Sequence, residues 1–177
     1  MADAARNVFL VGPMGSGKTT IGQRLAGLLG LDFVDCDREL EAHTGASVNL
    51  IFDVEGEEGF RSREAALLRE LAVRDDIVLA TGGGVVIDAG NRAVLKARGL
   101  VVYLKTSVDQ QLRRLSRDRT RPLLQTPDRR RRLQQLAEQR NPLYEDVADI
   151  EFPARNRNAD VVARQLADVI RAHREKA

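Results

Sequence analysis

The sequence has one cysteine, no tryptophan and an aromatic content of only 4% over 177 residues. A single cysteine excludes an internal disulfide and a cysteine-rich metal site, and this composition is typical of a reducing compartment. So few aromatic side chains argue against a stacking platform for nucleic-acid bases. Nothing around Cys36 marks its thiol as a nucleophile.

Long apolar runs are also missing. No stretch reaches the roughly 20 apolar residues that span a bilayer, and Met1–Arg6 lacks the apolar segment of a signal peptide. The two histidines, His43 and His173, lie in polar stretches without neighbouring metal ligands, so we predict surface positions for both. Together these absences predict a cytoplasmic protein that has no membrane partner.

The net charge is only +2, but the charges are segregated along the chain. Residues 31–76 hold thirteen acids and five arginines, whereas residues 105–140 hold eleven basic residues and four acids. Two interpretations of Arg129–Arg132 are open, a nucleic-acid surface and a solvated helix face, and we favour the second. A third interpretation, a clamp on polyanionic ligands, suits Arg121 and Arg140 because of the motifs around them.

Short β-rich runs alternate with longer helical runs, which predicts βαβ units around a parallel sheet. No repeat or linker divides the chain, so residues 1–177 are expected to form a single domain. A segment at about 117–128 has two prolines and no periodicity, which predicts a mobile loop between two arginine-rich helices. The expected strands are 7–11, 33–34, 77–80, 100–104 and 150–152.

The run from Gly12 to Thr19 matches the pattern G-x-x-x-x-G-K-[ST], with an apolar strand before it and an amphipathic helix after it. Its glycines let successive backbone N–H groups turn inward around phosphate oxygens. Lys18 brings positive charge to the phosphates, and the Thr19 hydroxyl is a magnesium ligand. The predicted nucleotide contacts here are Met14, Gly15, Ser16, Gly17, Lys18, Thr19 and Thr20.

Asp35 and Asp37 stand two residues apart at the end of the expected strand 33–34. In an extended chain their side chains face the same way. One carboxylate can support Mg²⁺, and the other can accept the proton of an attacking hydroxyl. Asp37 also precedes a helical stretch, where it could act as the N-cap, and the two roles are compatible.

Three glycines, Gly82–Gly84, follow the expected strand 77–80. Successive glycines indicate a place where another group approaches closely, with a plain loop as the alternative. The carboxyl end of a strand is also where open α/β sheets bind ligands.

Arg61 and Arg140 each offer a planar fork that suits a carboxylate. For Arg61 the alternative is a surface pair with Glu64, one helical turn away. Pro142 predicts that the helix carrying Arg140 ends just after it.

The combination of these motifs resembles the shikimate kinase family along nearly the whole chain. The elements are the Gly12–Thr19 loop, Asp35-Cys-Asp37, Phe60-Arg61, Gly82-Gly83-Gly84, Arg121-Pro-Leu-Leu124 and Arg140-Asn-Pro-Leu-Tyr144. The resemblance implies a three-layer α/β P-loop kinase fold, with a parallel five-stranded sheet flanked by helices, like nucleoside monophosphate kinases, and with a lid loop. It also implies transfer of the ATP γ-phosphoryl group to the 3-hydroxyl of shikimate, with Mg²⁺, in chorismate and aromatic amino-acid biosynthesis.

The resemblance also implies roles on the substrate side. Substrate-binding helices lie at about 37–74, Asp35 is the metal-side residue, and Asp37 touches the substrate hydroxyls. Arg61 and Arg140 hold the shikimate carboxylate. The glycine turn lies against the substrate through Gly82, Gly83 and Gly84.

On the nucleotide side, the resemblance places Arg121 in the lid, where it closes over ATP. Arg121, Lys18 and Asp37 then form the catalytic set. Arg114 and Arg157 flank the adenine, although the register leaves Arg155 as an alternative to Arg157.

Two rival functions remain. A gluconate or nucleoside monophosphate kinase shares the scaffold but lacks Gly82–Gly84 in combination with Asp37 and Arg61. An inactive P-loop module could bind RNA through Arg129–Arg132, but the intact Lys18, Asp37 and other site residues argue against it. The expected partners are therefore ATP and shikimate, without nucleic acid, and the expected state is a monomer.

Overall fold

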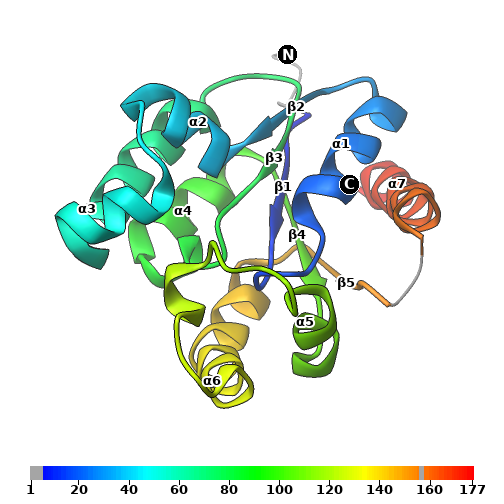
Figure 1. Ribbon diagram of the computed structural model, residues 1–177. Helices are drawn as coiled ribbons and strands as arrows, with labels where there is room; N and C mark the ends of the chain where they lie inside the picture. Colours follow the sequence, from blue (N-terminus) through cyan, green and yellow to red (C-terminus); the bar gives the residue numbers. More distant parts are fainter. Residues whose placement is uncertain (1–5, 156–157) are drawn as a thin grey trace.

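The computed structural model describes residues 6–155 and 158–177 and consists of a five-stranded sheet enclosed by helices (Figure 1). The strand order is β2-β3-β1-β4-β5, and every neighbouring pair is parallel. The predicted parallel sheet is thus confirmed, with strand ends that differ by one residue. The strands are β1 Val8–Val11, β2 Asp32–Asp35, β3 Ile77–Ala80, β4 Leu100–Lys105 and β5 Ile150–Pro153.

Helices cover both faces of the sheet. One face carries α1 and α7, and the other carries α3, α4 and α6, while α2 and α5 lie beside the carboxyl ends of the strands (Figure 1). Of the helices in the described ranges, none is both long and apolar enough to cross a membrane. The helices are α1 Lys18–Leu29, α2 Cys36–Thr44, α3 Val48–Ala72, α4 Ala89–Arg98, α5 Val108–Arg114, α6 Arg129–Val147 and α7 Ala159–Lys176.

The central strand β1 is buried on both faces. Phe9 and Val11 pack on the α3 side, whereas Val8 and Leu10 pack on the α1 and α7 side, and all four are fully buried. A strand in the middle of a parallel sheet has no solvent face, which is why its sequence is continuously apolar. The loops that follow such strands therefore have a rigid base.

The expected end of a helix at Pro142 is wrong, because α6 continues through Pro142 to Val147. A proline inside a helix removes one hydrogen bond and costs about 3 kcal/mol. Leu136 before it and Tyr144 and Val147 after it are buried. Their packing into the core offsets that cost, and local sequence could not reveal this.

Gly22 and Gly27 form a matched pair for testing how closely α1 packs on the sheet. A Cβ atom at Gly22 would lie 2.7 Å from Phe33 Cε2 and 3.1 Å from Leu10 Cδ1, whereas one at Gly27 would meet nothing within 4 Å. We expect Gly22→Ala to lower the free energy of unfolding by about 1–3 kcal/mol through overpacking. Gly27→Ala should raise it by up to about 1 kcal/mol through helix propensity. Urea denaturation measures both, and shifts of the same sign would contradict this packing.

Candidate active site

Two cavities open beside the carboxyl ends of β1, β2 and β3. The smaller, about 200 Å³, is lined by the loop after β1, and the larger, about 380 Å³, extends between α2, α3, α6 and the segment before α6. The two cavities share one wall. The residues that line both are Met14, Thr19, Asp35, Asp37, Gly82, Gly83 and Arg121.

The loop from Gly12 to Gly17 wraps around the Lys18 side chain. Lys18 Nζ donates to Gly12 O at 2.7 Å and Pro13 O at 2.9 Å, and it lies 3.3 Å from Ser16 Oγ. Gly12 has a φ of 149°, and a Cβ there would lie 2.8 Å from Leu104 O. Only glycine fits this position without a clash, and it lets the backbone turn around the Lys18 ammonium group.

Burial lowers the pKa of Lys18 to about 7, and the positive charge of Arg121 adds to this effect. The carboxylates of Asp37 and Asp35 oppose the shift without cancelling it. Desolvation disfavours the charged form of a buried amine. An anionic group bound beside Lys18 would therefore favour its charged form.

Helix α5 supports the loop from behind. Gln111, which is buried, donates to Met14 O at 2.9 Å, and Arg114 Nη1 donates to Gly15 O at 2.8 Å. Arg114 was expected to flank an adenine, and its guanidinium lies against the loop from Gly12 to Gly17. Arg155 lies at another cavity with Phe152, and Arg157 falls outside the described residues.

Asp35 and Asp37 reach the same cavities by a different geometry from the expected one. Asp35 ends β2 and is the N-cap of α2, where it accepts from Arg38 N, whereas Asp37 lies inside the first turn. The premise of an extended chain and the alternative of Asp37 as N-cap are therefore both wrong. Thr19 Oγ1 donates to Asp35 Oδ2 at 2.6 Å, which brings together two oxygen ligands of the kind that Mg²⁺ prefers.

Burial raises the pKa of Asp37, and the neighbouring Asp35 raises it further, while Arg121 and Lys18 act in the opposite direction. A carboxylate in this setting is a better proton acceptor than a free aspartate. Cys36 between them is buried, and burial raises the pKa of its thiol well above the ordinary value. Nothing therefore activates this thiol as a nucleophile.

The glycine turn makes room for charged side chains. A Cβ at Gly82 would lie 2.8 Å from Glu64 Oε2, and one at Gly84 would come closer than 3.0 Å to the Arg61 guanidinium. Gly83 O accepts a hydrogen bond of 2.5 Å from the buried Tyr144 hydroxyl. The close approach predicted from three glycines is thus present, and the approaching groups are protein side chains.

Three charged side chains meet beside this turn, the buried Glu64 and Arg140 and the partly buried Arg61. Arg61 Nη1 donates to Glu64 Oε1 at 2.9 Å, and Glu64 and Arg140 are each 5% exposed. Within the described residues, Arg61 Nε, Glu64 Oε2 and Arg140 Nε are buried without a hydrogen-bond partner. Burial raises the pKa of Glu64 and lowers that of Arg140. Buried polar atoms without partners carry a desolvation penalty that a bound ligand can relieve.

The Arg61–Glu64 pair forms as the alternative anticipated, but it is not a surface pair. Glu64 is on the same face of α3 as Phe60, Leu67 and Leu71, and all four are buried. A charged residue within an apolar helical stripe is a signal for a candidate site residue, and it was overlooked. Gln111 was also missed, and Tyr144 was named in a motif without a role, since each contacts a loop distant in sequence.

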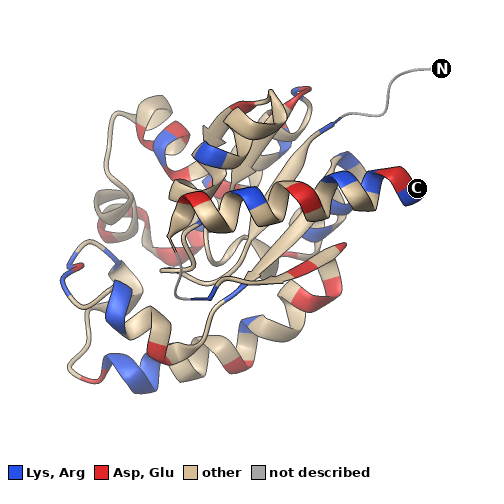
Figure 2. Ribbon diagram, turned by 90° about the vertical axis from the view of Figure 1, so that its right-hand side faces the viewer, with Lys and Arg blue, Asp and Glu red and all other residues tan. Residues whose placement is uncertain are grey.

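Basic residues gather at the start of α6 and on the segment before it (Figure 2). Arg130 and Arg131 are exposed, as expected of a solvated face. Arg129 and Arg132 do not fit the expected solvated face, because they donate to the backbone carbonyls of Leu115 and Leu123, respectively. His43 is on the surface as predicted.

A shikimate kinase family model matches residues 14–171. A shikimate kinase of Pasteurella multocida is 54% identical over 93% of this chain and 95% of its own length. One of Vibrio cholerae is 54% identical over 95% and 97%, respectively. The solved shikimate kinase of Acinetobacter baumannii in complex with shikimate has a TM-score of 0.93 at 47% identity, and the match covers 96% of this chain and 94% of that one. The chain belongs to the shikimate kinase family.

Proposed function

We propose that this chain transfers the γ-phosphoryl group of ATP to the 3-hydroxyl of shikimate, giving shikimate 3-phosphate and ADP. The observation that carries the proposal is the shared wall of the two cavities. Asp37 and Arg121 line both, between the Lys18 loop on one side and two arginines with unpartnered buried Nε atoms on the other. Phosphoryl transfer needs this arrangement, because it depends on positioning and on stabilising negative charge.

The larger cavity is proposed to hold shikimate, with Arg61 and Arg140 binding its carboxylate. A carboxylate accepts paired hydrogen bonds from arginine, and such charge-assisted bonds are about twice as strong as neutral ones. Glu64 accepts from Arg61 Nη1 and so fixes the orientation of the fork. The glycine turn, Gly82–Gly84, leaves the space in which these side chains and the substrate ring come together.

The smaller cavity is proposed to hold the phosphates of ATP, with Met14, Lys18 and Thr20 among its lining residues. Thr19 and Asp35 would hold Mg²⁺, because their oxygens are 2.6 Å apart and line this cavity. When bound, Mg²⁺ supplies charge neutralisation between the phosphate oxygens.

Asp37 is proposed to bind the attacking hydroxyl and to accept its proton. Its burial raises the pKa of the carboxyl, which suits that role. Lys18 and Arg121 are proposed to stabilise the charge that spreads over the transferred group. The segment carrying Arg121 lines the larger cavity and is proposed to keep water out during the reaction.

The proposed partners are ATP and shikimate alone, and the proposed state is a monomer. The large exposed apolar side chains of the described residues are spread over α1, α3, the turn at Val85–Ile87 and α7, instead of forming one broad patch.

The substrate is tested by ADP release with shikimate, gluconate and nucleoside monophosphates. We expect release to depend on shikimate, because the buried Nε atoms of Arg61 and Arg140, which lack a hydrogen-bond partner in the described residues, favour a carboxylate, and Asp37 selects a nearby hydroxyl. Turnover of gluconate or a nucleotide at a comparable kcat/KM would overturn the proposal.

Gly84→Ala tests the arginine fork without removing it. The added Cβ would displace the Arg61 guanidinium, so the KM for shikimate should rise by about tenfold, which corresponds to about 1.4 kcal/mol. The KM for ATP should stay within about twofold, because Arg61 does not line the smaller cavity. Steady-state kinetics measure both constants. Gly27→Ala, with open space at its Cβ, serves as the control. A normal KM for shikimate in Gly84→Ala would remove Arg61 from the substrate site.

Lys18 should take up a proton when nucleotide binds. Its pKa of about 7 means that at about pH 8 some nine tenths of the free protein carries it neutral. A bound phosphate favours the ammonium form, while the nucleotide is already deprotonated because the second phosphate pKa is about 6. Calorimetry of ADP binding in two buffers of different ionisation enthalpy should therefore give close to one proton bound. Lys18→Met should give almost none, and equal uptake by both proteins would refute the assignment.

A further inference from the structure

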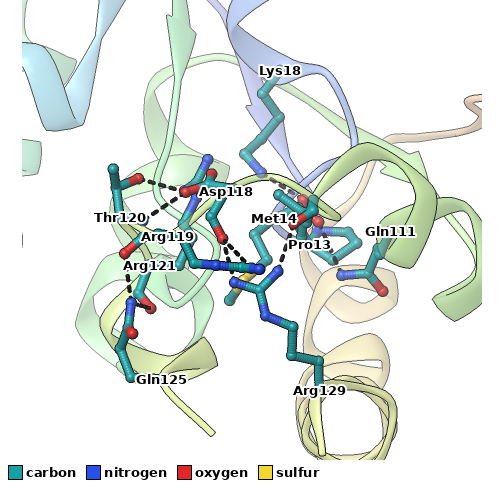
Figure 3. Close-up of polar contacts among 11 residues, drawn as sticks. Pro13, Met14, Lys18, Gln111, Asp118, Arg119, Thr120, Arg121, Gln125 and Arg129 are labelled. Atoms are coloured by element: carbon teal, nitrogen blue, oxygen red, sulfur yellow. Dashed lines mark hydrogen bonds and ion pairs between the residues drawn. The ribbon is translucent and has the colours of Figure 1, made fainter. Parts of the chain in front are cut away.

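The segment between α5 and α6, residues 115–128, is organised around one carboxylate (Figure 3). Asp118 Oδ1 accepts from the Thr120 backbone N–H at 2.8 Å and from the Thr120 hydroxyl at 2.7 Å. Asp118 Oδ2 accepts from Arg121 Nε at 3.3 Å. The Asp118 side chain is 23% exposed and that of Arg121 is 40% exposed. We call residues 115–128 the lid segment.

The backbone at Asp118 is itself held from α6. Arg129, in the first turn of α6, donates to Leu115 O at 2.5 Å and also donates to Asp118 O. Figure 3 shows its side chain extending from the helix to the lid segment. Gln125 Nε2 adds bonds to Arg119 O at 2.6 Å and Arg121 O at 3.3 Å. The backbone that carries the Asp118 carboxylate is therefore held in place.

Arg121 lies at the junction of the two cavities. It lines both of them, and its charge lowers the pKa of Lys18 and that of Asp37. Because the bond to Asp118 uses Nε, the two terminal nitrogens of the guanidinium remain available for phosphate oxygens. A planar fork that is already oriented loses less entropy when it binds.

We propose that Asp118 is a positioning residue for phosphoryl transfer, which orients Arg121 through Nε so that its terminal nitrogens meet the transferred phosphoryl group. This inference rests on the proposed function of the site. Asp118 itself lines neither cavity, so it acts through Arg121 alone. Although burial raises the pKa of Asp118, the hydrogen bonds from Thr120 and the charge of Arg121 bring it below the ordinary value. The carboxylate is thus charged at neutral pH.

A local turn is the competing explanation, since aspartates often hydrogen-bond to a backbone N–H two residues on. Asp118→Asn distinguishes a local turn from the positioning of Arg121. Its amide oxygen can keep the bond to Thr120 N, while the charge that attracts Arg121 is lost. Asp109→Ala is the matched control. It removes another aspartate that is paired with an arginine, at 2.8 Å from Arg130, outside both cavities.

Steady-state kinetics of the full chain with ATP and shikimate provide the first test. We expect Asp118→Ala to lower kcat about tenfold and Asp118→Asn about threefold, with the KM for shikimate nearly unchanged, as for a contact that matters in the transition state. Asp109→Ala should stay within about twofold. In an Arg121→Ala background, Asp118→Ala should lower kcat by less than about twofold, because the effects of residues that act as a unit are not additive.

Equal losses of kcat in both backgrounds would refute the proposal, as would a kcat in Asp118→Asn equal to that of the wild type. A gain in kcat or in ATP affinity would also refute it, since Asp118 would then compete with phosphate.

A second measurement does not depend on turnover. Hydrogen exchange at Arg121 Nε, followed by NMR in the ligand-free protein, should accelerate about tenfold or more in Asp118→Ala and in Asp118→Asn but not in Asp109→Ala. Unchanged exchange would refute the proposal. If the wild-type protein released no ADP with shikimate, the proposed function would fail, and the exchange data would still decide whether Asp118 orients Arg121.

Discussion

The parallel pairing of β3 with β1 is the constraint on which the site depends. Thr81 donates both its backbone N–H, at 3.2 Å, and its hydroxyl, at 2.7 Å, to Leu10 O. These bonds hold the glycine turn after β3 beside the Gly12–Gly17 loop after β1. On the other side of β3, Asp35 pairs in register with Ala80. One edge of the sheet thus presents the loop, the carboxylate and the turn together, as open α/β sheets do at their carboxyl ends.

Charges buried at this edge are not fully matched by the protein itself. Lys18 is held by carbonyl oxygens, and Arg61, Glu64 and Arg140 each leave one buried polar atom without a partner in the described chain. Such groups lower stability, because a buried polar atom without a hydrogen bond costs about 1–3 kcal/mol. A folded scaffold whose central strand is buried and apolar on both faces tolerates that cost. In return, an anionic ligand finds cations that are already desolvated and oriented.

The sheet was predictable from the sequence because apolar runs follow a local rule. The Gly12–Thr19 loop could be located because its glycine-rich motif has a fixed spacing. Prediction from the sequence failed where a tertiary contact outweighs a local preference. Pro142 remains inside α6 because core packing on both sides outweighs the lost hydrogen bond. Asp35, not Asp37, caps α2, since propensity alone does not distinguish two aspartates so close together. Gln111 in α5 bonds to Met14, and Tyr144 in α6 bonds to Gly83. No short window of sequence contains both partners of either bond.

Helix α6 contacts the lid segment, the larger cavity and the glycine turn, which lie far apart in the sequence. Arg129 in its first turn holds the lid segment, Arg140 reaches the larger cavity, and Tyr144 bonds to the glycine turn. At about 1.5 Å of rise per residue, Arg129 and Arg140 are about 16 Å apart along the helix axis. A packed helix does not shorten or stretch, so the base of the lid segment keeps a fixed distance from Arg140. Movement of Arg121 relative to the larger cavity must therefore arise within the lid segment itself, where the Asp118 carboxylate restricts it.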